Sequence, residues 1–322
     1  MQWLICCTRP EMNIRPYNDK DHKKVLLYLQ EFNPSVSEQE WNNMLSFTWN
    51  DPIGIKAMLM EENDRVGGFL SYIGSENKVG DGKMTFCNIS SWVVNEEFRS
   101  KSLLLLSRLF DVKNVVILNL SPHVNTLPIF RSLRFNLLSE HEYIINPIKI
   151  KRQISSSGKI KVQKINKADP GKEVPEAEKN IIRDHSRYPN VEFFEVTLEN
   201  DPQKKKLILA FNVKTLRVAG SLVPRLKELP YKLLGRNKQF ELLYVSDPEL
   251  LEKEFGTIML EITNVTASRT ITVSEHFLNY TNMQIGYGSY AKKSRPWFYY
   301  CEQSLSANEV NVLYSEKVLL DF

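Results

Sequence analysis

Apolar residues recur at helical spacing in the first half of the chain. Residues 25–32 have the period of an amphipathic helix. Residues 37–47 have the same period, and Ser37 and Glu40 have the spacing of a capping box, which marks a helix start. Two shorter segments predict further helices, over residues 103–110 and 126–133.

Segments rich in apolar and β-branched residues predict strands around these helices. Residues 115–120 (VVILNL) are almost continuously apolar, as expected of a strand buried on both faces. Residues 62–65 predict a hairpin turn, and the polar, glycine-containing residues 75–83 predict a loop. The predicted strands are residues 13–15, 55–61, 66–74, 84–94, 115–120 and 143–145. The predicted order of the first half is therefore β-α-α-β-β-β-α-β-α-β, a mixed α/β fold.

The second half of the chain mixes the same patterns. Before it, residues 149–167 carry seven Lys and Arg residues and no acidic residue, which predicts either a solvated linker or an anion-binding strap. The sequence SDPE at residues 246–249 predicts a helix start, with a helix over residues 250–255. The other predicted elements are a helix over residues 173–187 and strands over residues 191–198, 206–213, 240–245, 257–263 and 310–320.

Composition and charge narrow the class of protein. The chain of 322 residues is long enough for two domains, and 42% hydrophobic with 25% charged residues is typical of a soluble globular protein. A net charge of +4 suits a small polyanionic ligand but disfavours a nucleic-acid partner. No apolar run is long enough for a membrane span, and the first residues do not resemble a signal peptide. The four cysteines, Cys6, Cys7, Cys87 and Cys301, have no regular spacing, so we expect reduced thiols, no metal site and a cytoplasmic location.

Residues 93–107 (VVNEEFRSKSLLLLS) combine a strand end, a basic turn and an apolar helix. Small residues and cations in the turn, FRSKS at residues 98–102, precede the predicted helix directly. Backbone N–H groups at a helix start favour negative charge, and nearby cations strengthen this effect. The stretch therefore predicts a site for a diphosphate; an ordinary strand–turn–helix connection is the alternative.

The same stretch resembles the signature of the GNAT superfamily of acyl-CoA-dependent N-acyltransferases. VNEEFR at residues 94–99 is similar to Val-x-Pro-x-Tyr-Arg, and RSKSLL at residues 99–104 is similar to Arg-x-x-Gly-x-Gly/Ala. IFRSLRF at residues 129–135 is similar to Leu-Tyr-x-x-x-Gly-Phe, and the element order of residues 12–146 follows the family. The resemblance implies an α/β (α+β) fold with a GNAT-like central mixed sheet flanked by helices, followed by a second mixed α/β GNAT-like domain.

The chain departs from the signature at several positions. Ser102 and Leu104 replace the two glycines, and Leu104 is the larger change because glycine lets a backbone approach a ligand closely. Phe130 replaces the tyrosine that protonates the leaving thiolate in many members. An active enzyme of this family would then need another group or water for that step.

The resemblance implies a set of site residues. The acyl carbonyl would be polarised by a backbone N–H near a bulge at Val93 or Val94, and Asn88 and Ser90 would hold a water relay in place of an acid on this strand. His123 is the candidate acid or base, with capping of the following helix as the alternative. A polar cluster at residues 140–142 has either a catalytic role or a solvated position. The residues predicted to bind acyl-CoA are Val93, Val94, Arg99, Ser100, Lys101, Ser102, Leu103, Leu104, Asn125 and Phe130.

The sequence predicts two domains joined by a linker, and it leaves three functions open. We predict a GNAT acyltransferase domain over residues 12–148, a basic linker over residues 149–170 and a degenerate GNAT-like domain over residues 171–322. The expected activity is transfer of an acyl group from acetyl-CoA or another acyl-CoA to an amine of a small molecule or amino sugar. The alternatives are an aminoacyl-tRNA-dependent transferase of the tandem-GNAT type and a non-catalytic protein that senses acyl-CoA or binds a partner. A homodimer is left open, and no membrane partner is expected.

Overall fold

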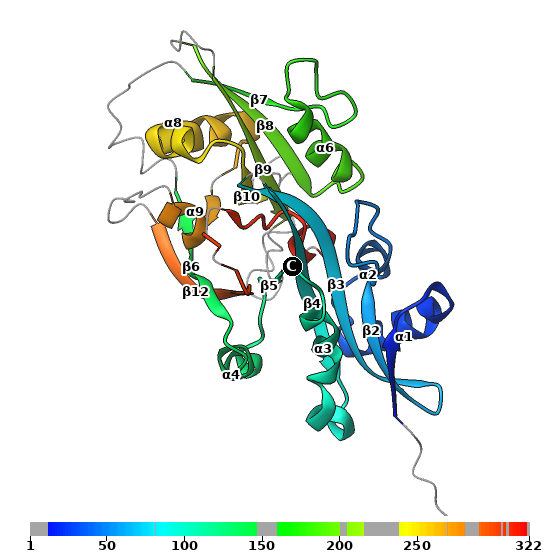
Figure 1. Ribbon diagram of the computed structural model, residues 1–322. Helices are drawn as coiled ribbons and strands as arrows, with labels where there is room; N and C mark the ends of the chain where they lie inside the picture. The colour runs from blue at the N-terminus through cyan, green and yellow to red at the C-terminus, as the bar shows by residue number, and fades with distance from the viewer. Residues whose placement is uncertain are drawn as a thin grey trace, which may run out of the picture. The chain divides into compact units, whose positions relative to one another are not determined.

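The computed structural model describes residues 12–80, 82–146, 160–199, 205–215, 238–268, 270–280, 290–303, 305–306 and 309–320 (Figure 1). The chain divides into two compact units, and each combines segments that are far apart in the sequence. As far as it is described, the first unit contains residues up to 136, residues 298–303 and residues 314–320. The second unit contains the described residues between 137 and 297 and between 305 and 313. The domain limits given above, at residues 12–148, 149–170 and 171–322, stay a prediction.

From β1 to α4, the helices and strands of the first unit follow the predicted order, whereas the strand predicted over residues 143–145 lies in the second unit. Helix α2 begins after Ser37, whose side chain and that of Glu40 form the predicted capping box. The 3-10 helices are η1 (Asp19–Asp21), η2 (Glu96–Lys101) and η3 (Val124–Thr126). The other elements are β1 (Asn13–Pro16), α1 (His22–Phe32), α2 (Glu38–Leu45), β2 (Ala57–Glu62), β3 (Arg65–Val79), β4 (Gly82–Val94), α3 (Leu104–Phe110), β5 (Val115–Asn119), α4 (Leu127–Ser132) and α10 (Glu316–Leu319).

A mixed sheet forms the centre of the first unit. Strands β1 to β4 are antiparallel neighbours in chain order, and β5 lies parallel to β4. On its other side β5 pairs antiparallel with the last residues of β12 (Tyr290–Tyr300), from Phe298 to Tyr300. All of β5 is buried, as its apolar sequence predicted.

The β3–β4 hairpin is longer than the sequence predicted. Residues 75–83 are not a loop, because the ladder continues from Ser75↔Phe86 to Val79↔Gly82. The far end of this hairpin carries exposed and half-buried polar residues on both faces. The alternation of apolar and polar residues that identifies a strand is therefore missing there.

Helix α3 packs its leucines against the sheet. Leu105, Leu106 and Leu109 are fully buried in a core that also contains Tyr72 and Phe130. The tyrosine hydroxyl donates a hydrogen bond to the backbone carbonyl of Leu105. The helix predicted over residues 103–110 is thus confirmed, beginning at Leu104.

The strands of the second unit are hydrogen-bonded neighbours in the order β6-β11-β10-β9-β8-β7. Three phenylalanines from neighbouring strands, Phe194, Phe211 and Phe240, lie in its core with ring centroids 5.8–6.3 Å apart. Its elements are β6 (Asn136–Ile145), β7 (Ile160–Lys164), α6 (Glu176–Asp184), β8 (Val191–Leu198), β9 (Lys206–Thr215), β10 (Lys238–Val245), α8 (Pro248–Thr266), β11 (Thr270–Ser274), α9 (Glu275–Tyr280) and most of β12.

Two predicted strands are wrong. Residues 257–263 lie in α8, where Ile258, Met259 and Ile262 are buried at helical spacing despite the β-branched composition. Residues 310–320 contain the short helix α10 and no strand. The helix predicted over residues 250–255 is the first part of α8, which begins with Asp247 as its N-cap.

The basic segment before the second half is described from residue 160 onward. Lys164 forms an ion pair with Glu192 at 2.8 Å. Lys167 donates hydrogen bonds to the backbone carbonyls of Tyr188 and Val191, and burial lowers the pKa of this lysine. Two lysines of the basic segment, Lys164 and Lys167, therefore have partners within the second unit. Residues 149–159 of this segment, together with Cys6 and Cys7, lie outside the described residues.

In the described part of the chain, no helix combines the length and the apolar character needed to cross a membrane.

Candidate active site

Strands β4 and β5 part at the centre of the first unit. They pair in parallel from Thr85↔Val115 to Asn88↔Leu118. Strand β5 then ends at Asn119, whereas β4 continues to Val94. Beyond Asn88, the described strand pairs give β4 no partner on the β5 side, and we call this place the divergence of β4 and β5. Backbone groups of a central strand that are outside a ladder need other partners, such as a ligand.

A β-bulge interrupts β4 just beyond this point. Phe69 pairs with Val93 and Ser71 with Ser90, so that Ser91 and Trp92 together lie opposite one residue of β3. Ser91 has φ +52°, a left-handed conformation that costs a non-glycine residue about 1–2 kcal/mol. A bulge takes a backbone N–H out of the ladder, and such a donor can stabilise negative charge on a carbonyl oxygen. Val93, predicted to lie beside the bulge, follows it directly and is buried; Val94 is half-buried.

The two polar residues predicted on β4 lie at the divergence. Asn88 and Ser90 are 1% and 5% exposed. The Asn88 amide lies 3.5 Å from the backbone carbonyl of Leu118, and its Oδ1 accepts the backbone N–H of Glu316 at 3.3 Å. The Ser90 and Ser91 hydroxyls are 3.4 Å apart. Both residues therefore lie on β4 near the end of its pairing with β5, and their role as a water relay stays a prediction.

His123 lies on the surface and caps a helix. Its Nδ1 accepts the backbone N–H of Asn125 at 3.3 Å, at the start of η3. A neutral ring that accepts at Nδ1 carries its proton on Nε2, so it can donate a proton there but not accept one. The described hydrogen bonds do not join His123 to Asn88 or Ser90. This geometry corresponds to the capping alternative, and a catalytic role for His123 stays a prediction; Asn125 is exposed beside it.

The β4–α3 connection is an exposed 3-10 helix. Arg99, Ser100 and Lys101 are exposed, and the Arg99 guanidinium lies 4.0 Å from the carboxylate of Glu96. Three amides at the start of α3 already donate within the connection: Ser102 to Arg99, Leu105 to Ser102 and Leu106 to Leu103. Leu103 and Leu104 are 46% and 47% exposed. The turn thus presents cations and apolar side chains, and these three amides have backbone partners.

Phe130 belongs to the core. Its ring has no exposed surface and lies 5.8 Å from that of Phe298 and 6.1 Å from that of Trp92. Trp92 sits in the β4 bulge, and its indole Nε1 is a buried donor without a hydrogen-bond acceptor among the described residues. The predicted contact of Phe130 with acyl-CoA stays a prediction.

Ser121 and Glu316 are polar residues near the candidate site that the sequence did not identify as candidates. Glu316 lies in α10 with no exposed surface, and its carboxylate accepts a hydrogen bond from the exposed Ser121, just after β5. The two residues belong to the same unit but are separated by 195 positions. Residues 310–320 were predicted as a strand, and no short-range pattern relates them to β5.

The polar residues 140–142 belong to β6 in the second unit. The Nδ1 atom of His141 lies 3.2 Å from the carboxylate of Glu275, which also accepts the backbone N–H of Glu140 at 3.0 Å. Glu142 is 4% exposed and lies 3.5 Å from Arg295. These residues thus have partners inside the second unit.

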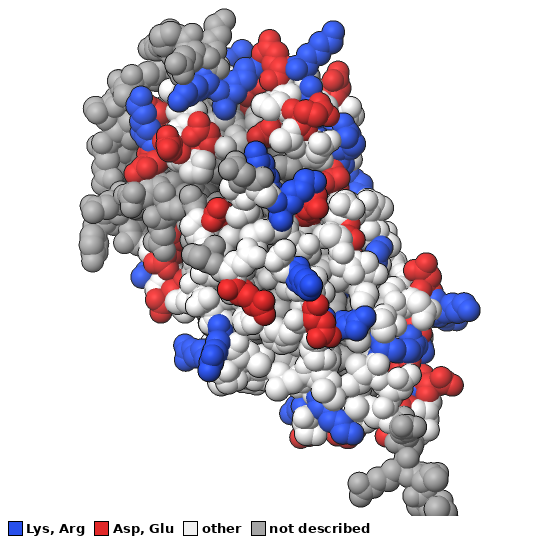
Figure 2. Space-filling view, in the orientation of Figure 1, with Lys and Arg blue, Asp and Glu red and all other residues white. Residues whose placement is uncertain are grey.

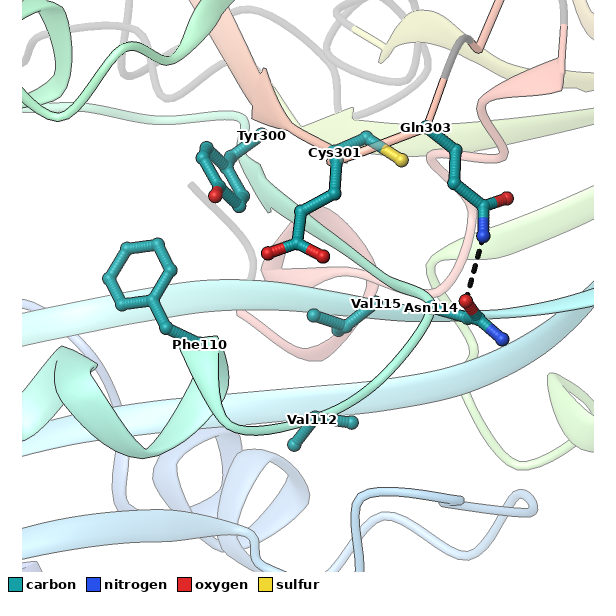
Figure 3. A pocket seen from close by; sticks show the side chains of 8 residues that line it. Phe110, Val112, Asn114, Val115, Tyr300, Cys301 and Gln303 are labelled. Atoms are coloured by element: carbon teal, nitrogen blue, oxygen red, sulfur yellow. Dashed lines mark hydrogen bonds between the residues drawn. The ribbon is translucent and has the colours of Figure 1, made fainter.

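A pocket opens near the start of β5 (Figure 3). Its cavity volume is only about 20 Å³, and the side chain of Gln303 donates a hydrogen bond to Asn114 at 2.7 Å among the lining residues. It is lined by Phe110, Val112, Asn114, Val115, Tyr300, Cys301, Glu302 and Gln303. The divergence of β4 and β5 is at the other end of β5, so this pocket is not the site that Asn88 and Ser90 form.

Comparisons with known proteins bear on the fold. The chain matches no protein-family model, and no curated protein matches it. Solved structures are similar: a GCN5-related N-acetyltransferase from Anabaena variabilis ATCC 29413 has a TM-score of 0.57 at 9% identity, over 90% of this chain and 72% of that one. The chain has the GNAT-superfamily fold.

Two further structures support this fold. A GCN5-related N-acetyltransferase from Kribbella flavida has a TM-score of 0.53 at 10% identity, over 90% of this chain and 71% of that one. A conserved protein of unknown function from Enterococcus faecalis V583 has a TM-score of 0.54 at 10% identity, over 90% and 73%. The predicted GNAT-like mixed sheet with flanking helices is thus confirmed. A tandem arrangement of two GNAT copies stays a prediction.

Proposed function

We propose that the protein transfers an acyl group from acyl-CoA to the amine of a small molecule or amino sugar. The observation that carries this proposal is the divergence of β4 and β5 after Asn88 and Leu118, next to the bulge at Ser91, in a chain with the GNAT fold. Two of the similar structures are named N-acetyltransferases. A thioester lying along the free edge of β4 would meet the backbone of the bulge.

The residues on each side of the bulge have distinct roles in this proposal. When bound, acyl-CoA supplies an activated thioester. The exposed cations Arg99 and Lys101 would attract its phosphates, with Ser100 and Ser102 as small neighbours. The bulge would polarise the acyl carbonyl, and the buried amide and hydroxyl of Asn88 and Ser90 would orient a water or the amine.

Calorimetric titration with acetyl-CoA and longer acyl-CoAs tests this proposal. We expect the wild type to bind and Ser102→Glu to bind at least about tenfold more weakly, because a carboxylate would then repel the phosphates. Ser107→Glu is the matched control, since it adds the same charge on the exposed face of α3, and we expect it to bind like the wild type. Absence of binding by the wild type would contradict the proposal.

An acceptor screen follows a positive titration. Release of free thiol from acetyl-CoA would be recorded with a panel of small amines and amino sugars. Turnover with at least one amine is the expected result, and it would identify the acceptor class.

A non-catalytic acyl-CoA-binding protein is the second candidate. The buried Phe130, which offers no hydroxyl for protonation of a thiolate, favours it. Binding of acyl-CoA without thiol release by any amine would support this candidate over the transferase.

The tRNA-dependent alternative stays a prediction. On the face shown in Figure 2, described basic and acidic side chains lie intermixed, and the net charge of the chain is only +4. A polyanion such as tRNA binds best to a surface where cations are concentrated.

A further inference from the structure

Glu316 is a fully buried carboxyl group at the divergence of β4 and β5. It lies in α10, and neither it nor its neighbour Ser315 has any exposed surface. Burying an ionisable group is unfavourable unless polar partners compensate it. Its carboxylate accepts a hydrogen bond from the hydroxyl of Ser121, and its backbone N–H is fixed by Asn88.

Ser121 connects this buried carboxylate to the surface. Ser121 is exposed, whereas Glu316 is fully buried. It follows β5 by two residues, and β5 leaves β4 after Leu118. The structure thus holds a surface hydroxyl in line with a buried carboxylate, beside the strand edge where the acyl group is proposed to lie.

We infer that Ser121 and Glu316 remove the proton from the acceptor amine. This inference rests on the proposed acyl transfer. A serine hydroxyl alone is a poor base, but it can accept a proton while it passes its own to a hydrogen-bonded carboxylate. His123 does not serve as such an acceptor in the tautomer that caps η3.

The step balances with these two residues. The amine nitrogen forms a bond to the acyl carbon, and the bond from that carbon to sulfur breaks, with its electron pair leaving on the thiolate. The proton lost by nitrogen moves to the Ser121 oxygen as the Ser121 proton moves to Glu316. Because Glu316 is fully buried, this proton then returns through the Ser121 hydroxyl to the thiolate or to water. Ser121 contacts the substrate, and Glu316 acts through it as a positioning residue.

Steady-state kinetics of four variants and one control variant test the inference. We expect Ser121→Ala and Glu316→Gln each to lower kcat by about 100-fold, the usual size of a proton-transfer contribution, with KM for acetyl-CoA unchanged. The double variant should lose no more than either single one, because the two residues act as a unit. Ser121→Thr should recover most of the loss, since it keeps the hydroxyl. Ser132→Ala, an exposed serine on α4, is the matched control for a change of serine to alanine.

A readout without turnover complements the kinetics. Infrared difference spectra of wild type and Glu316→Gln isolate the Glu316 carboxyl band at neutral pH. We expect the band of an ionised carboxylate, shifted in Ser121→Ala because a hydrogen bond is lost. A protonated carboxyl, or a band indifferent to Ser121→Ala, would overturn the inference even if a variant folds poorly and loses activity for that reason.

The two proposals fail in different ways. If acyl-CoA binds and is turned over but Ser121→Ala keeps the kcat of the wild type, the proton route is wrong and the acyl transfer stands. If the wild type binds no acyl-CoA, the proposed function is wrong, and the proton route is wrong with it.

Discussion

At the scale of single residues, buried histidines link stability to pH. His185 and His276 in the second unit are 0% and 1% exposed. Burial lowers the pKa of each imidazole to about 4, below the value of about 6.5 for an unfolded chain. Both rings are therefore neutral in the folded protein at pH values where the unfolded chain binds protons.

We expect the second unit to lose stability as the pH falls from about 6.5 to about 4. In that interval the unfolded state takes up protons that the folded state cannot, so the free energy of unfolding decreases with decreasing pH. At pH 5 the loss should be about 2 kcal/mol for each histidine. Urea unfolding at pH 7 and pH 5 measures it.

Glutamine variants separate this effect from general acid denaturation. The variant with both His185→Gln and His276→Gln should have a flatter dependence of stability on pH between these values. His123→Gln is the control, because that ring is exposed. An equally steep dependence in the double variant would show that other groups are responsible.

The residues of the candidate site differ in how well the sequence revealed them. Asn88 and Ser90 could be selected as candidates from the sequence because polar residues stand out in an otherwise apolar strand pattern. The resemblance to the family signature indicated which strand to consider. Ser121 and Glu316 could not be found, since their contact joins segments 195 positions apart and neither has a signature of its own. Whether a polar residue contacts a distant one depends on the tertiary fold, which periodicity does not encode.

At the scale of elements, strongly periodic helices and apolar strands were predictable. Strand β5 and the capped helix α2 are examples. The failures were the polar end of the β3–β4 hairpin and the apolar residues 257–263 and 310–320. A short apolar run fits a buried helix as well as a strand, and a polar strand end looks like a loop.

Close packing against the β3–β4 hairpin gives an element-scale prediction. A Cβ added at Gly74 would lie 1.8 Å from Oδ1 of Asp51 and 2.9 Å from Cγ1 of Ile53. Gly74 also accepts the indole N–H of Trp49 at 2.8 Å. We expect Gly74→Ala to lower the free energy of unfolding by about 2 kcal/mol, because the Asp51 loop must move.

Gly82→Ala is the matched control in the same hairpin. The atom nearest to a Cβ added at Gly82 would be the backbone oxygen of Val79, at 3.8 Å. We therefore expect the free energy of unfolding to change by no more than about 0.5 kcal/mol. Chemical denaturation of both variants measures the difference. Equal stability of the two variants would contradict the packing argument.

At the scale of the whole molecule, each unit depends on distant segments. The first unit includes the described residues 298–303 and 314–320, and β5 pairs with the end of β12. Composition and linker patterns predicted domains that are each continuous in sequence. Nothing in the local sequence marks residues near the end of the chain as part of the first unit.

A fragment of residues 12–148 tests this dependence. It lacks α10 and the strand residues Phe298 to Tyr300, so β5 would have an open edge and Asn88 would lose a partner. We expect broad, non-cooperative thermal unfolding, measured by circular dichroism, against a sharp transition for the full chain. A sharp transition in the fragment would support the predicted limits at residues 12–148 instead.

The return of residues 298–320 to the first unit also sets the timing of its folding on the ribosome. Synthesis adds about 5–20 residues per second, so about 10–40 s separate the emergence of residue 136 from that of residue 320. During that time the nascent first unit presents an unfilled place beside β5 and an uncovered Asn88. Molecular chaperones that shield exposed strand edges would be needed in this interval, and a translational pause within it would lengthen the exposure.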